Sequence, residues 1–221
     1  MIKQVHPIDR QEMDKILYRK KHQLKFIRGF DFIASTGGFI LLLPLFLLVS
    51  ILIMLDSPGP AIFKQTRIGR NSKPFQIRKF RSMKARSYPD NNLVTTSEDQ
   101  RVTRVGKFIR KLKIDELPQL INVMLGDMSL VGPRPEVPKF VEQYDQDARQ
   151  ILRVRPGITD LASIEYFDES TILSSADDVE QTYIDEIMPL KHQLNYEYIR
   201  NMGLMYNLKI IFKTLARVIK S

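Results

Sequence analysis

Two adjacent carboxylates, Asp115 and Glu116, are the residues of this sequence best suited to chemistry; they stand in the run KIDELPQLINVMLGDMSLVGPRP at 113–135. An aspartate can attack a phosphate and form an acyl-phosphate, which divides one difficult displacement into two easier ones. A neighbouring carboxylate can share a divalent cation or move a proton. An aspartate at this position can also cap a helix whose first turn contains Pro118. The residues alone leave both interpretations open.

Three basic residues are candidates for contacting the phosphate in such a reaction. Arg134 stands between Pro133 and Pro135, whose fixed φ angles stiffen the backbone that presents a guanidinium suited to bidentate phosphate contacts. Lys79 and Arg81 lie two residues apart and would share one face of a strand. For all three, a salt bridge or a solvated surface is the alternative.

Other familiar catalytic arrangements are absent from the sequence. There is no cysteine, which excludes disulfides, thiolate zinc sites and a cysteine nucleophile. His6, His22 and His192 stand far apart, and no glycine-rich phosphate loop or nucleophile elbow occurs. Asp127 directly follows Gly126 and is either a metal ligand or, as is commoner, a turn residue.

Residues 32–55 form an uncharged segment of 24 residues, FIASTGGFILLLPLFLLVSILIML. A straight helix needs about 20 apolar residues to cross a bilayer, so this length predicts membrane insertion. Pro44 removes a backbone hydrogen bond near the middle and favours a break there. Lys and Arg flank both ends, and positive charge favours the cytoplasmic side. A segment that enters, bends and returns keeps both flanks inside; a kinked membrane-spanning helix is the alternative.

The formal net charge of +9 is concentrated in three basic blocks. Residues 1–28 carry eight Lys and Arg against three acidic residues, while residues 64–86 carry nine and residues 101–113 carry six without any acid. Such blocks indicate an anionic partner, whether nucleic acid, anionic lipid or a phosphorylated substrate.

The remaining pattern predicts a mostly helical α+β chain. Residues 61–69 predict a strand, and the apolar spacing of 74–83 fits a strand or a helix. Predicted helices cover 101–112, 116–125, 136–155, 180–200 and 204–220, with a surface loop at 87–100 and a break at 155–158. We divide the chain into a basic arm (1–28), a helix-break-helix membrane segment (29–56) and a catalytic domain (57–221) that ends in an amphipathic helix.

Several long motifs follow one another in a fixed order: FDFIAS (30–35), SPGPAIFKQTRIGRNSKPFQIRKFRSM (57–83), TRVGKFIRKLKIDELPQLINVMLGDMSLVGPRP (103–135) and RPGIT (155–159). From about Phe26 to its end, the chain thereby resembles the bacterial sugar transferases that act as monotopic, small polyprenol-phosphate phosphoglycosyl transferases. The resemblance implies a re-entrant membrane helix broken near Pro44, amphipathic helices on the membrane surface, and a place on the cytoplasmic face of the bacterial cytoplasmic membrane.

The resemblance also implies a reaction. A sugar 1-phosphate passes from a UDP-sugar to polyprenol (undecaprenyl) phosphate in two Mg²⁺-dependent steps, with release of UMP, as the first membrane step of a glycoconjugate pathway such as lipopolysaccharide or capsule synthesis. Asp115 corresponds to the nucleophile, Glu116 to a second carboxylate that binds metal or activates the lipid phosphate, and Arg134 and Lys79 to phosphate contacts. The sequence departs from the family pattern at Asp160, Ser163 and Asn207.

Two other classes of protein are alternatives to this one. A membrane-anchored module could bind nucleic acid or anionic lipid through the basic blocks, but the sequence has no helix-turn-helix and no aromatic residues interleaved with basic ones. A two-carboxylate glycosidase is disfavoured because adjacent residues cannot straddle a bond at the required separation of about 5 Å or more. We expect no nucleic-acid partner, and the sequence leaves the sugar and any homo-oligomer open.

Overall fold

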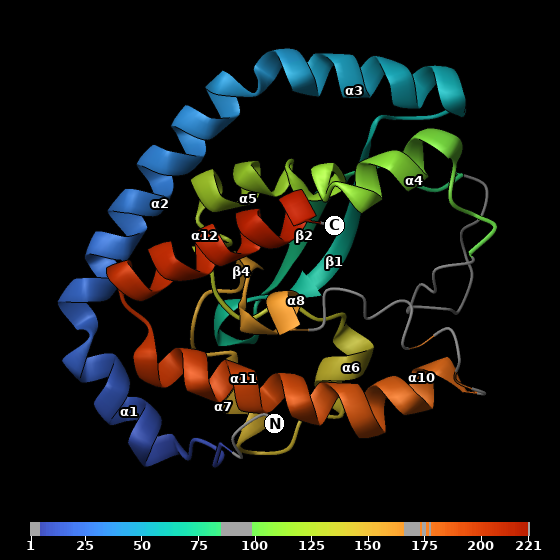
Figure 1. Cartoon of the computed structure of the whole chain (residues 1–221). Coiled ribbons are helices and arrows are strands. Elements are labelled where there is room, and N and C mark those ends of the chain that lie inside the picture. The colour runs from blue at the N-terminus through green and yellow to red at the C-terminus, as the bar shows by residue number, and fades with distance from the viewer. Residues whose placement is uncertain (1–4, 85–98, 166–172, 174–175, 177, 221) are drawn as a thin grey trace.

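Helices make up most of the described chain, with two short sheets among them (Figure 1). The computed structural model describes residues 5–84, 99–165, 173, 176 and 178–220. The first half contains α1 (Arg10–Arg19), α2 (Lys21–Leu41), α3 (Leu43–Asp56), β1 (Ile62–Ile68), η1 (Arg70–Ser72), β2 (Pro74–Phe80), α4 (Arg104–Lys111), the 3₁₀ turn η3 (Ile114–Glu116) and α5 (Gln119–Leu125). The second contains β3 (Ser129–Val131), α6 (Pro138–Glu142), α7 (Ala148–Ile151), β4 (Gly157–Thr159), α8 (Leu161–Glu165), α10 (Val179–Thr182), the π-helical η4 (Tyr183–Ile187), α11 (Met188–Asn201) and α12 (Leu204–Lys220). The prediction of a mostly helical α+β chain is confirmed.

Both sheets have two strands. Strands β1 and β2 pair antiparallel, with Ile62 opposite Phe80; the segment at 74–83 that fitted either helix or strand is therefore a strand. Strands β3 and β4 pair in parallel. At the second sheet the backbones of Gly132 and Gly157 nearly touch, since a Cβ added to Gly157 would lie 2.1 Å from the Gly132 nitrogen. Only glycine permits this approach, which brings the loop after β3 against the start of β4.

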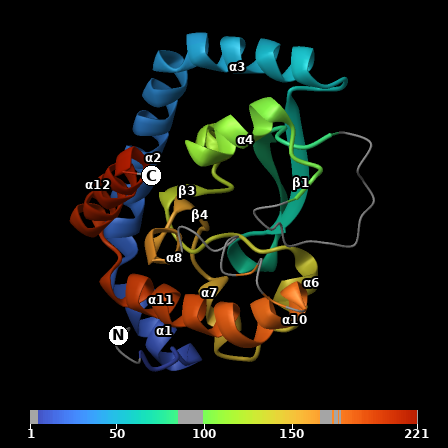
Figure 2. The ribbon, with the colours of Figure 1, turned by 45° about the vertical axis from the view of Figure 1, so that its right-hand side comes forward.

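The apolar segment forms two helices that meet at a sharp bend. Helices α2 and α3 are inclined by 61° at Leu42, and Pro44 lies in the first turn of α3. A proline in a first turn is tolerated because its missing N–H would have no partner there. The predicted break beside Pro44 is confirmed, and α2 and α3 arch over one side of the molecule (Figure 2). Within the described residues, no single helix meets the length and hydropathy that a membrane crossing needs, whereas this bent pair meets them together.

The outer faces of α2 and α3 expose an unusual number of large apolar side chains. Exposed residues are Phe32, Ile33, Ile40, Leu41, Leu43, Leu47, Leu48, Ile51, Leu52, Met54 and Leu55. The inner face of α3 buries Phe46, Val49 and Ile53 against Phe80 and Ile109. A contiguous apolar surface of this kind indicates a lipid or protein contact rather than exposure to water.

Polar contacts fix α2 to the rest of the chain. The buried Asp31 accepts hydrogen bonds from the Ser129 hydroxyl (2.7 Å) and the Leu130 amide (3.3 Å) of β3. Arg28 donates to the carbonyls of Val123 and Met124 at the end of α5. Helix α2 is therefore joined directly to the end of α5 and to β3, which lie just before and within the GDMSLVGPRP run at 126–135.

Several predicted boundaries change. Helix α2 begins at Lys21, ahead of the division placed after residue 28, and α1 buries Met13 in a cluster that includes Ile199 of α11. The predicted helix at 136–155 is wrong in extent, because only the short α6 and α7 occupy it. The helices predicted at 101–112, 180–200 and 204–220 are confirmed to within a few residues. The predicted loop at 87–100 lies almost entirely outside the described residues.

Candidate functional site

Asp115 and Glu116 lie in the 3₁₀ turn η3 between α4 and α5. The interpretation of Asp115 as a helix cap is wrong, since Pro118 occupies the cap position of α5 and no side chain caps that helix. Lys113, two residues before Asp115, has a φ of 55°. Residues other than glycine and asparagine rarely adopt this left-handed backbone conformation. Strained backbone of this kind persists where surrounding structure over-determines it, which is common at functional sites.

Glu116 is held by two cations from distant parts of the chain. Its carboxylate lies 2.8 Å from Lys79 Nζ, on β2, and 2.6 Å from Arg134 Nη2, in the loop after β3. Burial alone would raise the pKa of Glu116, but Arg134 and Lys79 outweigh it and hold that pKa well below its usual range. Glu116 is therefore ionised throughout the neutral range and is not a proton donor there.

Asp115 has a different environment from its neighbour. The residue is 8% exposed, and no described residue donates a hydrogen bond to its carboxylate. Burial raises the pKa of Asp115, Lys79 opposes the rise, and the Glu116 charge adds to it. A carboxylate that is poorly solvated and not hydrogen-bonded is more nucleophilic than one held by donors.

Two buried polar residues position the cations that hold Glu116. The Asn122 side chain accepts from the Arg78 amide (3.0 Å) and donates to the Gln76 carbonyl (2.7 Å), which fixes β2, and therefore Lys79, beside α5. Asp160 accepts from the Arg134 amide (3.1 Å). The structural role of Asp160 is therefore to fix the backbone that presents Arg134.

The structure does not bring Arg81 to this group. Its guanidinium is buried and donates to the carbonyls of Ser57 and Pro58 (both 2.6 Å) and of Ile53 (3.4 Å) at the end of α3. The two residues Lys79 and Arg81 were predicted to contact phosphate from one face of a strand. Strand β2 ends at Phe80, so they do not share such a face. Arg81 instead caps the end of α3, so the prediction that it contacts the substrate phosphate together with Lys79 is corrected.

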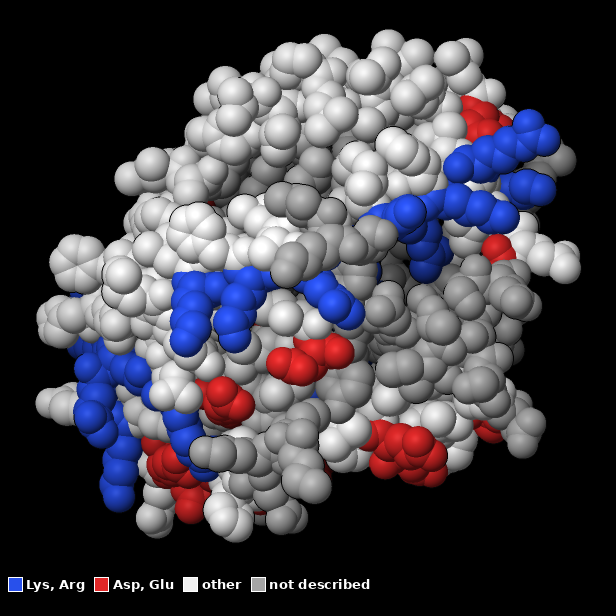
Figure 3. Space-filling view, in the orientation of Figure 1, with Lys and Arg blue, Asp and Glu red and all other residues white. Residues whose placement is uncertain are grey.

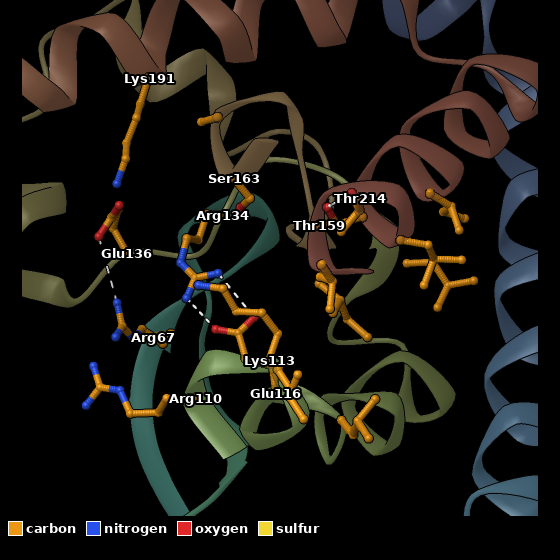
Figure 4. Close-up of a pocket in the computed structure, with 18 of the residues that line it drawn as sticks. Arg67, Arg110, Lys113, Glu116, Arg134, Glu136, Thr159, Ser163, Lys191 and Thr214 are labelled. Atoms are coloured by element: carbon orange, nitrogen blue, oxygen red, sulfur yellow. Dashed lines mark hydrogen bonds and ion pairs between the residues drawn. The ribbon is translucent and has the colours of Figure 1, made fainter. Parts of the chain in front are cut away.

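A cavity of about 500 Å³ opens beside Glu116 and Arg134 (Figure 4). One wall is apolar and comes from α5, the second sheet and α12, with Leu120, Leu130, Ile158, Ile211, Leu215 and Val218. The lining also contains the polar side chains of Arg67, Arg110, Lys113, Glu136, Tyr183 and Lys191. These polar residues come from five separate stretches of the chain, so nothing in the sequence marked them as one site, although Arg67, Arg110 and Lys113 lie in its basic blocks. The Glu136 that directly follows the GPRP run was the one local signal.

A magnesium ion was expected at Asp115 and Glu116. In the part of the chain that the structure describes, no three His, Cys, Asp or Glu side chains cluster as metal ligands. Mg²⁺ commonly binds one or two carboxylates together with substrate phosphates and water. The free Asp115 carboxylate beside Glu116 fits that kind of site, with phosphate oxygens completing it.

Comparison with known proteins places this site in context. The sequence profile of the bacterial sugar transferases matches residues 22–221. A UDP-N-acetylgalactosamine-undecaprenyl-phosphate N-acetylgalactosaminephosphotransferase of Aeromonas hydrophila is 42% identical over 195 residues, which are 87% of this chain and 43% of that protein. A UDP-glucose:undecaprenyl-phosphate glucose-1-phosphate transferase of Escherichia coli K12 is 38% identical over 86% of this chain and 39% of its own length. A protein of the same description from Caulobacter vibrioides is 37% identical over 87% of this chain and 69% of its length.

The chain therefore spans about two fifths of the length of the first two relatives and about two thirds of the third. The relatives differ in the sugar that their names give, so similarity alone does not select one. The nucleic-acid-binding alternative gains no support from these names.

Proposed function

The chain belongs to the bacterial sugar transferase family, and from this premise we propose that it transfers a sugar 1-phosphate from a UDP-sugar to polyprenol (undecaprenyl) phosphate and releases UMP. The observation that carries the proposal is the contrast between the adjacent carboxylates of Asp115 and Glu116. Glu116 is fixed between Lys79 and Arg134, which hold its pKa well below the usual range, whereas the adjacent Asp115 carboxylate accepts no hydrogen bond from any described residue. One residue organises cations for a phosphate, and the other is available to attack it.

We propose two displacements. A carboxylate oxygen of Asp115 bonds to the phosphorus that carries the sugar, the bond from that phosphorus to the bridging oxygen breaks, and UMP leaves with the electron pair. A phosphate oxygen of the lipid then attacks the same phosphorus, and the bond to Asp115 breaks, which restores the carboxylate. Arg134 and Lys79 stabilise the negative charge that develops on the phosphoryl oxygens. Glu116 keeps both cations in place and does not itself transfer a proton, because its pKa is held well below its usual range.

Magnesium belongs to the proposal as well. Asp115 and Glu116 would hold the ion, and when bound it would neutralise charge on the substrate phosphates. We expect the reaction to require Mg²⁺, and the assay of UMP release also tests this requirement.

The purified chain in detergent or nanodiscs, supplied with undecaprenyl phosphate and Mg²⁺, should release UMP from at least one of UDP-glucose, UDP-galactose and their N-acetyl counterparts. Release should stop when EDTA removes the metal and should resume when Mg²⁺ is restored. Liquid chromatography separates UMP from UDP, so release of UDP instead would contradict the proposed bond cleavage. A protein that turned over none of these donors would contradict the proposal itself.

We further propose that α2 and α3 enter and leave one leaflet, on the cytoplasmic face of the bacterial cytoplasmic membrane. The 61° bend and the exposed apolar outer faces support this placement. Basic side chains gather over α4 and α12 (Figure 3), whose exposed Phe108 and Phe212 add apolar contacts. Such combinations suit helices that lie in the interface with anionic lipid.

Cysteines introduced singly at Lys25, in the second turn of α2, and at Lys64, in β1 after α3, test this topology. The chain has no native cysteine, so no other thiol of this chain reacts. Both positions should resist a membrane-impermeant maleimide in intact cells and react after lysis. Labelling of one position from outside would show a crossing helix and contradict the re-entrant arrangement.

A further inference from the structure

A second cluster of buried polar residues lines the cavity near Asp115 and Glu116. The Glu136 carboxylate accepts a hydrogen bond from the Tyr183 hydroxyl (2.5 Å) and lies 3.8 Å from Arg67. Lys191 donates to the same tyrosine hydroxyl (3.3 Å) and lies 4.7 Å from the centre of its ring. We call these four residues the Glu136 cluster. They come from β1, the loop after Arg134, η4 and α11, and all four line the cavity.

The Glu136 cluster lies beside Arg134, one of the two proposed phosphate contacts, and has no part in the proposed displacements. Glu136 follows Arg134 by two residues, so their Cα atoms lie at most about 7 Å apart. Arg67 lies near both Glu136 and the residues around Glu116. Burial lowers the pKa of its guanidinium, the Glu136 and Glu116 charges raise it, and the Arg134 charge lowers it. In Figure 4 the Arg67 and Glu136 side chains lie on one side of Arg134, with Lys191 beyond Glu136. The sugar of the donor is bonded directly to the phosphate under attack, so it must occupy a neighbouring position of this kind.

The Glu136 cluster offers both hydrogen-bond acceptors and donors, which suits the hydroxyl groups of a sugar. A carboxylate on the cavity wall repels a phosphate but accepts hydrogen bonds from sugar hydroxyls. The Arg67 guanidinium and the Lys191 ammonium carry several N–H groups that can donate to the same hydroxyls, and the Tyr183 hydroxyl, whose hydrogen goes to Glu136, can accept from them. These side chains are largely buried and hold one another by hydrogen bonds and an ion pair, so they are ordered before a ligand arrives. Fixed polar groups of this type in a concave site confer orientation and selectivity.

We propose that the Glu136 cluster binds the hydroxyl or acetamido groups of the donor's sugar and determines which sugar the chain accepts. This inference rests on the proposed function. Selectivity follows from geometry, because a buried site built to hydrogen-bond a particular substituent is left with unpaired polar groups when that substituent is missing or reversed.

Tyr183→Phe and Glu136→Gln test the inference, and Tyr144→Phe is the matched control. Tyr144 is a buried phenol that packs on His192 and does not line the cavity. UMP release is measured with UDP-glucose, UDP-galactose and their N-acetyl counterparts, UMP affinity is measured by calorimetry, and thermal unfolding is followed for each variant. Tyr183→Phe removes one hydroxyl and keeps the ring, so it remains informative if Glu136→Gln folds poorly.

We expect Tyr183→Phe to lower kcat/KM for the preferred donor by about 10- to 100-fold, the effect of one lost buried hydrogen bond. The preference between donors that differ at one hydroxyl should change by at least about tenfold, whereas UMP affinity and the Tyr144→Phe control should stay near wild type. Equal losses for all donors, a parallel loss of UMP affinity, or unchanged kinetics would each overturn the inference while leaving the proposed function intact. If the wild-type chain releases no UMP from any donor, the proposed function fails and the inference fails with it.

Discussion

Replacing Asp115 by asparagine is expected to lower UMP release by roughly 10⁴-fold or more, the scale of loss when a covalent nucleophile is removed. The amide keeps the shape of the side chain but cannot form the acyl-phosphate. The measurement is single-turnover UMP release by purified protein, with mass spectrometry of the trapped protein to detect the sugar-phosphate adduct on the wild type.

The same substitution carries a second, independent expectation for stability. Folding raises the pKa of Asp115, so the folded state binds this proton more tightly than the unfolded state does. Above that raised pKa the ionised side chain opposes folding, and the opposition disappears as the pH falls below the ordinary aspartate value. Asp115→Asn should therefore unfold at a higher temperature than wild type at pH 7, and the difference should shrink towards pH 4.

Asp127→Asn serves as the control for both measurements. Asp127 lies beyond the other end of α5 and accepts a hydrogen bond from Asn122, away from the cavity. We expect nearly normal UMP release from it, which would also exclude Asp127 as the metal ligand considered from the sequence. Turnover by Asp115→Asn within about tenfold of wild type would contradict the covalent mechanism.

Glu116→Gln is expected to have the second largest effect, because it affects both turnover and folding. The amide oxygen can still accept a hydrogen bond but carries no negative charge, so the largely buried Lys79 loses its anionic partner and the hold on Arg134 weakens. Breaking a buried ion pair typically costs about 3 to 5 kcal/mol, so chemical denaturation should show a loss of a few kcal/mol. UMP release should fall by about 100-fold or more as both cations lose their positions.

A double variant separates the two effects of this substitution. Adding Lys79→Met to Glu116→Gln removes the unpaired cation and should restore part of the stability without restoring UMP release. Glu180→Gln is the matched control, because Glu180 pairs with the exposed Lys139 at the surface, where such pairs contribute about 0 to 1 kcal/mol. If the double variant recovered activity together with stability, Glu116 and Lys79 would be structural residues only.

Features that depend on neighbouring residues were predictable from the sequence. The break beside Pro44 follows from one residue's covalent structure, and the end of α5 at Gly126 follows from the left-handed conformation that glycine permits. Strand β1 and the amphipathic tail helix α12 follow from apolar spacing over a few turns or strand positions. The adjacency of Asp115 and Glu116 is itself a feature of the sequence, as is the proline-framed Arg134.

Only the tertiary structure decided what each of these groups does. Glu116 meets Lys79 across 37 residues and Arg134 across 18. Burial raises the pKa of both carboxylates, but this encounter outweighs it at Glu116, whose pKa falls, while the pKa of Asp115 stays raised. The same packing turned Arg81 from a phosphate candidate into a cap for α3, and it assembled the Glu136 cluster from four elements. Local patterns carry no information about such encounters, because they depend on how whole helices and strands pack rather than on the spacing of residues within one of them.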